Sequence, residues 1–145
     1  MIAGLAAKRR GQNQFRAIET TIDQFRSATM NAFADELIAL NETFHDQIHA
    51  ASECRYLARM KKPYDAGIRR IIHVGSSERE KALVEHVVIG AAMNSGQSDE
   101  AERAMRDHVA RSGNTYLKMV SIKQEGNHDA IVKLRNALRG ISAFC

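Results

Sequence analysis

Four side chains of metal-ligating type stand at related positions in three helical segments of the 145-residue chain: Asn41, His45, His86 and His108. Asn41 and His45 are one helical turn apart, which places their Cβ atoms roughly 5–6 Å from each other. His86 and His108 flank a short connection, residues 94–98, that is predicted to join two antiparallel helices. Both histidines lie a similar number of residues from this connection. We therefore expect them at nearly the same level along the two helix axes, with their side chains directed toward one point.

Three imidazoles and an amide at one point predict a metal centre. Imidazole nitrogens suit zinc, nickel, copper or iron, at roughly 2.0–2.1 Å for zinc. A ligand set without a thiolate leaves coordination positions open, which is typical of a ligand-receiving or catalytic site rather than a structural one. His45 and His49 form a rival pair, but His49 turns away from the apolar stripe of its helix. The alternative is that each histidine is an ordinary core or surface residue.

The rest of the sequence predicts an all-α protein, an antiparallel bundle of six to seven helices. Strand-forming runs are nearly absent, and apolar residues recur with a period of 3.6 residues. The expected helices cover about residues 1–9, 14–33, 34–52, 54–74, 77–95, 98–120 and 128–139. Pro63 should kink or divide the fourth of these helices.

Boundaries and inner faces follow from the same pattern. Ser77 with Glu80 predicts a capping box, Ser98 predicts a second N-cap, and Gly96 predicts a helix end. The inner face of segment 14–33 is predicted to carry Phe15, Ile18, Ile22, Phe25, Met30 and Phe33. The inner face of segment 34–52 is predicted to carry Leu37, Leu40, Phe44, Ile48 and Ala51.

The composition argues against several classes of function. The net charge is +4, but no basic run exceeds Lys8-Arg9-Arg10, so neither a nucleic-acid stripe nor a stacking platform is visible. The isolated Cys54 and Cys145 favour a reducing compartment. No apolar run approaches the roughly 20 residues needed to span a bilayer, and the N-terminal charges follow the apolar stretch, the wrong order for a signal peptide. We therefore predict a cytoplasmic protein without membrane contact.

Three segments of the chain resemble a known family. Residues 40–45, Leu-Asn-Glu-Thr-Phe-His, resemble the Asp-x-x-Phe-His segment of the FCD domain, the effector-binding domain of FadR-type regulators in the GntR family. Residues 85–96 are similar to the Glu-His-x-x-Ile segment of that domain and to the Ala and Gly that follow it. Residues 101–108 are similar to the Ala-x-x-x-Met-x-x-His motif near the end of the domain. The order and spacing of these motifs together are fairly specific, and the similarity covers about residues 1–120.

The resemblance implies an all-helical homodimer that binds a small carboxylate or other metabolite in its core. In many members an Asp and three His hold a divalent metal, and by position these ligands are Asn41, His45, His86 and His108, with zinc or nickel as the expected ion. Asn41 replaces the Asp, so metal affinity should fall and an uncompensated dication should favour an anionic ligand. Arg69 or Arg70 would bind a carboxylate of the effector through two N–H groups of its guanidinium. The alternative is that these arginines are exposed to solvent.

The resemblance also predicts a domain organisation. Residues 1–124 are expected to form the FCD-like sensing and dimerisation domain, with its first helix cut short, and residues 125–145 a C-terminal helical extension. No winged helix-turn-helix is present, so DNA contact is expected only through an upstream domain. The chain is then a fragment of a regulator or a shortened paralogue.

Three functions fit these observations in decreasing order. The first is a non-enzymatic effector-sensing and dimerisation domain of a GntR-type transcription regulator. The second is a ligand-free structural or oligomerisation module, for which Asn41 would mark a decayed metal site. The third is a metal-dependent hydrolase or lyase, which is disfavoured because Glu42 points off the apolar stripe and Glu85 lies on the face beside His86.

Overall fold

The computed structural model describes residues 2–9, 11–31, 34–54 and 75–123, which contain five helices and no strand. The helices are α1 (Ile2–Arg9), α2 (Gln12–Asn31), α3 (Ala34–Ala51), α6 (Gly75–Asn94) and α7 (Ser98–Lys123). The predicted all-α class is therefore confirmed. The expected helices over 54–74 and 128–139, with Pro63, lie outside the described residues, and the count of six to seven helices stays a prediction.

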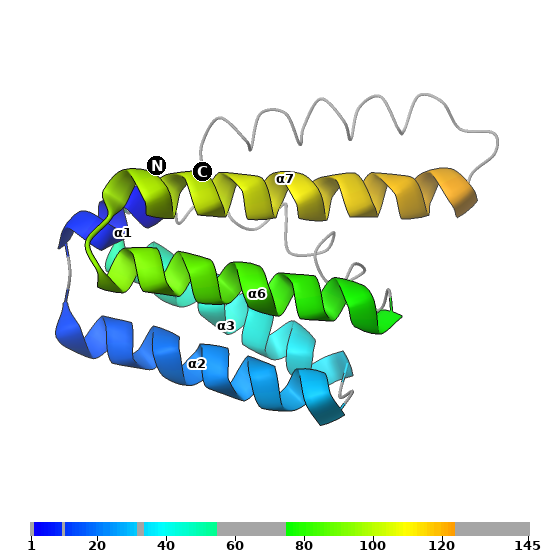
Figure 1. Ribbon diagram of the computed structural model, residues 1–145, viewed down its shortest axis with the longest axis horizontal. Helices are drawn as coiled ribbons and strands as arrows, with labels where there is room; N and C mark the ends of the chain where they lie inside the picture. Colours follow the sequence, from blue (N-terminus) through cyan, green and yellow to red (C-terminus); the bar gives the residue numbers. More distant parts are fainter. Residues whose placement is uncertain (1, 10, 32–33, 55–74, 124–145) are drawn as a thin grey trace.

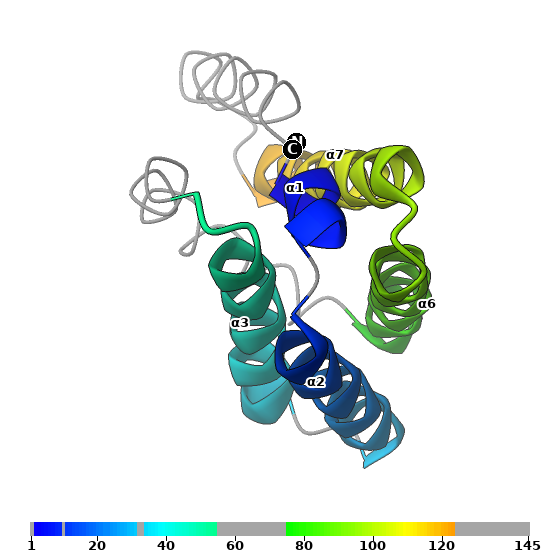
Figure 2. The same cartoon turned by 90° about the vertical axis from the view of Figure 1, so that its left-hand side faces the viewer.

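The long helices that pack side by side are antiparallel to one another (Figure 1). Helix α2 is antiparallel to α3 and to α6, and α6 is antiparallel to α7. The short α1 lies at one end, where it packs against α3, α6 and α7 (Figure 2). Its Ala3, Ala6 and Ala7 are fully buried, because side chains this small let the three neighbouring helices approach closely. The guanidinium of Arg9 donates to the carbonyl of Ser52, which ties the end of α1 to the end of α3.

Most of the residues predicted for the inner faces of α2 and α3 are buried, but Leu40 is only partly buried and Met30 is exposed. Phe33 lies outside the described residues. Phe25 and Phe44 are each 1% exposed, but Met30 is 82% exposed. The prediction for Met30 was wrong because five residues separate it from Phe25, which turns it well over a quarter of the way around the helix. Ala28 is buried in that turn instead.

The turn between α6 and α7 ends α6 where the sequence predicted. Gly96 has a φ of 70°, a left-handed conformation in which glycine is unstrained. Its amide donates to the carbonyl of Met93 and the amide of Gln97 to the carbonyl of Ala92, the hydrogen-bond pair of a Schellman motif. This tight connection makes α6 and α7 antiparallel neighbours.

Both predicted N-caps differ from the structure. Helix α6 begins at Gly75, so Ser77 lies inside the first turn rather than at the cap. Helix α7 begins at Ser98, whose hydroxyl donates 3.1 Å to the carbonyl of Gly4 in α1 instead of capping its own helix. A serine hydroxyl satisfies either role, and here the close approach of α1 supplies a competing acceptor.

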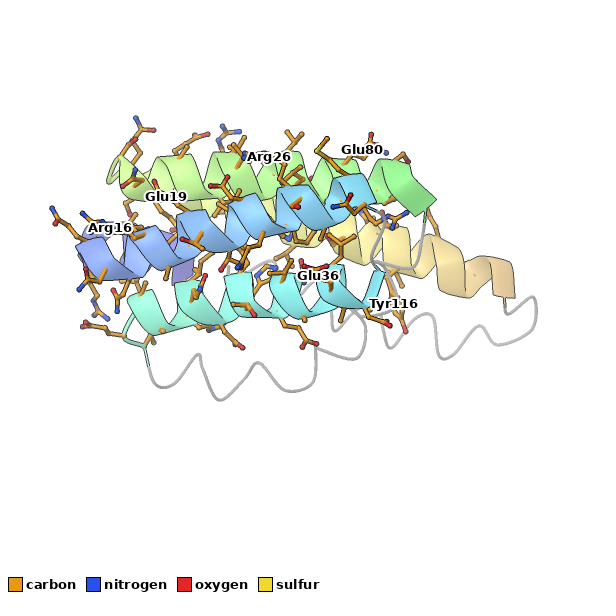
Figure 3. All side chains as sticks on the ribbon, turned by 90° about the horizontal axis from the view of Figure 1, so that it is seen from below. Arg16, Glu19, Arg26, Glu36, Glu80 and Tyr116 are labelled. Carbon is orange, nitrogen blue, oxygen red and sulfur yellow. The ribbon has the colours of Figure 1, made fainter. Side chains whose placement is uncertain are left out.

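Charged side chains lie on the outer sides of α2 and α6 (Figure 3). Figure 3 shows Arg16, Glu19 and Arg26 on the outer side of α2 and Glu80 on that of α6, and all four are exposed. Among the described helices, none combines the length and the apolar character that crossing a membrane requires.

The contact of Gly4 with α7 gives a prediction for stability. A Cβ at Gly4 would lie 2.9 Å from the backbone oxygen of Ser98, which cannot move without shifting α7. Overpacking of this kind costs about 1–3 kcal/mol, more than the helix propensity that alanine gains over glycine. We expect Gly4→Ala to lower the free energy of unfolding by about 1 kcal/mol in urea denaturation.

Gly90→Ala is the matched control, because its Cβ would meet only the terminal carbon of the Ile22 side chain, at 2.6 Å. That end can rotate away, so the control should retain full stability. Equal losses in the two variants would contradict the role assigned to the α1–α7 approach.

Candidate metal centre

The structure brings the three predicted histidines together from three helices. His45 lies in α3, His86 in α6 and His108 in α7, and one ligand nitrogen from each lies within 4.8 Å of the others. His49, the rival partner of His45, is not part of this group. The convergence of His86 and His108 across the Gly96 turn is the arrangement that their spacing predicted.

The closest pair already has the spacing of two ligands on one ion. His108 Nε2 lies 3.4 Å from His45 Nε2. Two nitrogens bound to a tetrahedral zinc ion at roughly 2.0–2.1 Å lie about 3.3–3.4 Å apart. The rings of these two histidines are stacked, with centroids 5.3 Å apart. The pair therefore fits a shared cation, which small movements of His86 would complete.

His86 is the most deeply buried of the three. Its side chain is fully buried, and its ring stacks on Phe44 with centroids 4.1 Å apart and meets Phe25 edge-on at 4.9 Å. Neither ring nitrogen has a hydrogen-bond partner among the described residues. Leaving a buried polar atom unpaired costs about 1–3 kcal/mol, and a bound cation would remove that penalty at one nitrogen.

Burial also determines the protonation state of His86. It lowers the pKa of His86 well below the ordinary value of 6.5, and the nearby His108, His45 and Arg111 lower the pKa further. The imidazole is therefore neutral at pH 7 and keeps a lone pair on one nitrogen. A neutral imidazole is the form that binds a metal ion.

Asn41 lies one turn before His45 in α3 and is 4% exposed. Its Nδ2 atom is buried and has no hydrogen-bond partner among the described residues. Rotation of the amide by half a turn exchanges its nitrogen and oxygen, so the oxygen can take this unpaired position. Asn41 thus has the burial and the free polar atom that a fourth ligand needs, and its role as a ligand stays a prediction.

A charged network joins His108 to the outer part of α6. Glu85 Oε2 lies 2.7 Å from His108 Nδ1, and the guanidinium of Arg111 binds both oxygens of Glu85, with Nη2 donating to Oε2 over 2.7 Å. Arg111 Nη1 also donates to Glu78 Oε2 over 2.6 Å, and the Thr115 hydroxyl donates to the same oxygen over 3.3 Å. The histidine is therefore held from behind by an ion pair.

The net effect of these contacts is to keep Glu85 ionised. Burial raises its pKa, but hydrogen bonds from His108 and Arg111 outweigh burial and bring the pKa below the ordinary value of 4.5. The hydrogen bonds to Glu85 also raise the pKa of Arg111, against the effect of burial. A carboxylate and a guanidinium thus face each other, both charged, beside the histidine cluster.

Glu85, Arg111 and Glu78 were not predicted from the sequence as parts of the site. Glu78 and Glu85 are two helical turns apart on α6, and Arg111 follows His108 by three residues on α7. This spacing places each pair on one face of its helix and could have indicated the network. It was missed because Glu85 was judged only as a general base. The predicted effector residues Arg69 and Arg70 lie outside the described residues.

Comparison with known proteins agrees with the motifs. A family model described as the FCD domain matches residues 1–111, which include all four predicted metal ligands. No curated protein and no solved structure matches the chain.

The buried neutral His86 gives a prediction for the pH dependence of stability. In chelator-treated protein the unfolded chain takes up a proton at His86 near pH 6.5, whereas the folded protein does so only at a lower pH. The free energy of unfolding should therefore fall as the pH drops from 7 to about 5, a range above the ordinary pKa of Glu85. Urea denaturation at a series of pH values measures this slope.

His86→Met is the matching variant, because methionine fills irregular apolar space and cannot titrate. It should be at least as stable as the unaltered protein at pH 7, since it removes two unpaired polar atoms, and should show a flatter slope. An identical slope in both proteins would contradict the assignment to His86.

Proposed function

Because the chain belongs to the FCD domain family, we propose that it senses a small carboxylate metabolite through a divalent metal ion, zinc or nickel, in its helical core. FCD domains are the regulatory, effector-binding domains of GntR-type transcription regulators and are generally non-enzymatic. The observation that carries the proposal is the convergence of His45, His86 and His108, together with the two nitrogens of the buried His86, which have no partner among the described residues. Asn41 is the proposed fourth ligand.

The charges around the centre support an anionic effector. Three imidazoles and an amide add no charge to a bound dication, and the nearby carboxylate of Glu85 is already paired with Arg111. A dication with neutral ligands in a low-dielectric core attracts an anion to its open positions. The ion would act as a Lewis acid that binds a carboxylate oxygen. Arg69 or Arg70 is proposed to bind the other end of the effector.

The same network argues against a hydrolase or lyase. Both oxygens of Glu85 accept hydrogen bonds, from Arg111 and on the His108 side, so this carboxylate is not available to take a proton from a metal-bound water. A sensing role needs no such base.

In the full regulator, we propose that residues 1–124 form the sensing and dimerisation domain and residues 125–145 a helical extension. DNA contact is assigned to a winged helix-turn-helix domain outside this chain. Effector binding would change the arrangement of the helices and so the spacing of two DNA-reading domains.

Helix α6 offers a surface for the proposed homodimer. Val84, Val87 and Val88 are 63%, 37% and 45% exposed, and with the exposed Ala91 they form a stripe at helical spacing. Figure 2 shows α6 at an edge of the bundle, and the exposure of the three valines shows that no described helix covers this face. The stripe is centred between Val87 and Val88, so a two-fold axis there would pair Val84 with the partner's Ala91. A second copy of the chain is the proposed occupant.

Metal binding is tested through Asn41. Restoring a carboxylate with Asn41→Asp should tighten zinc binding by at least about tenfold, because the new charge faces the cation at short range. Competition with a chromophoric chelator measures the affinity. Asn13→Asp, which adds the same charge on the exposed side of α2, should leave it unchanged.

Effector binding is tested by thermal melting in the presence of zinc or nickel with acetate, lactate, succinate or citrate. We expect the metal alone to raise the melting temperature and at least one carboxylate to raise it further. If metal, chelator and all four carboxylates leave the melting curve unchanged, the sensing proposal fails, although the fold stands.

The dimer surface is tested with Val88→Glu. A charge in the centre of an apolar interface should convert a dimer into a monomer in light-scattering chromatography. Ala39→Glu places the same charge on the exposed side of α3 and should leave the dimer intact. A monomeric unaltered protein, or a dimeric Val88→Glu variant, would count against this surface.

A further inference from the structure

We infer that Glu85 is a positioning residue of the metal centre, which fixes His108 in the tautomer that turns its Nε2 lone pair toward His45 and His86. The inference rests on the proposed metal site but concerns a residue outside the ligand set. Its basis is the contact between Glu85 and the ring nitrogen of His108 that faces away from the centre.

The first step is the assignment of the proton on His108. Glu85 Oε2 lies 2.7 Å from His108 Nδ1, a normal hydrogen-bond distance. The guanidinium of Arg111 donates to both oxygens of Glu85, so the carboxylate acts as an acceptor toward His108. The proton of this hydrogen bond must therefore sit on Nδ1. In the neutral imidazole Nε2 then carries the lone pair.

The second step is the direction of that lone pair. The opposite nitrogen, Nε2, lies 3.4 Å from His45 Nε2, and the centroid of the His108 ring lies 4.9 Å from that of His86. The hydrogen bond to Glu85 and the proposed metal site thus occupy opposite edges of one ring. A histidine with its proton on Nε2 would present an N–H to the site and could not bind a cation there.

The third step is what keeps Glu85 in place. Arg111 grips both carboxylate oxygens, and its remaining amino group binds Glu78. The side chains of Glu85 and Arg111 are 24% and 26% exposed, and that of His108 is 4% exposed. A two-pronged ion pair of this burial has fewer alternative conformations than a surface pair, so it can hold an acceptor at a fixed place.

The consequence is a gain in metal affinity that the ligand set alone does not supply. A carboxylate behind a ligating imidazole makes the imidazole a stronger donor and orients its ring, and losing such a partner typically weakens metal binding about 10–100-fold. In this chain Asn41 brings no charge to the cation. Glu85 is an anionic group in direct contact with a proposed ligand, at 2.7 Å from His108 Nδ1.

The test compares two carboxylates that share Arg111. Glu85→Gln removes the charge that touches His108, and Glu78→Gln removes a charge that touches only Arg111 and neighbours remote from the site. Each variant breaks one ion pair with the same guanidinium, so a general loss of stability would appear in both. Zinc affinity should fall about 10–100-fold in Glu85→Gln and stay near the unaltered value in Glu78→Gln.

Two further readouts separate positioning from stability. Nitrogen-15 NMR of chelator-treated protein should show His108 with its proton on Nδ1 in the unaltered protein and in Glu78→Gln, and a mixture of tautomers in Glu85→Gln. The cobalt-loaded proteins should give different visible spectra for Glu85→Gln and Glu78→Gln, because an incorrectly oriented His108 changes the ligand number.

The inference is overturned if Glu85→Gln keeps the tautomer of His108, or if both variants lose zinc affinity equally. The NMR measurement needs no metal and therefore tests the role of Glu85 even if the protein binds none. Failure of zinc to bind the unaltered protein would refute the proposed metal site, and the tautomer would still show whether Glu85 orients His108.

Discussion

The burial of His86 is the constraint on which the rest of the centre depends. A polar ring packed between Phe25 and Phe44 must stay neutral, because a charged imidazole there would lose its hydration without gaining a counter-charge. A neutral ring with no hydrogen-bond partner among the described residues is suited to bind a cation. The apolar packing therefore determines both the protonation state and the chemistry of the site. His45 and His108, contributed by α3 and α7, surround the same point.

Much of the fold follows from local sequence. Gly96 ends α6 because a left-handed residue is needed there, and this requirement is visible in the sequence. The periodicity of Phe15, Ile18, Ile22 and Phe25 predicted the buried face of α2 correctly. Ser98 shows where such reasoning stops, since its hydroxyl bonds to the Gly4 carbonyl, almost a hundred residues away in the sequence. Contacts between helices decide which of several local options a side chain takes.

The proximity of the three histidines could be predicted from the sequence for the same reason. His86 and His108 were predicted to lie close together because they are at similar distances from a tight turn between antiparallel helices. Asn41 and His45 were predicted to be neighbours because they are one helical turn apart. Glu85 and Arg111 were not anticipated, because their meeting depends on the rotation of α6 relative to α7. Helical periodicity defines a face of each helix but not which face meets which. Only the packed structure supplies that angle.

The network and the neutral Asn41 together bear on how a sensor of this kind would respond. Glu85 and Glu78 are paired with Arg111 and Lys81, so this network has no net charge and a dication at the centre would keep its two positive charges. A carboxylate at position 41 would cancel one of them within the protein. Without it, more of the cancelling charge has to come from the bound ligand. Metal and carboxylate would then each bind more tightly in the presence of the other, because thermodynamic coupling between two ligands is reciprocal.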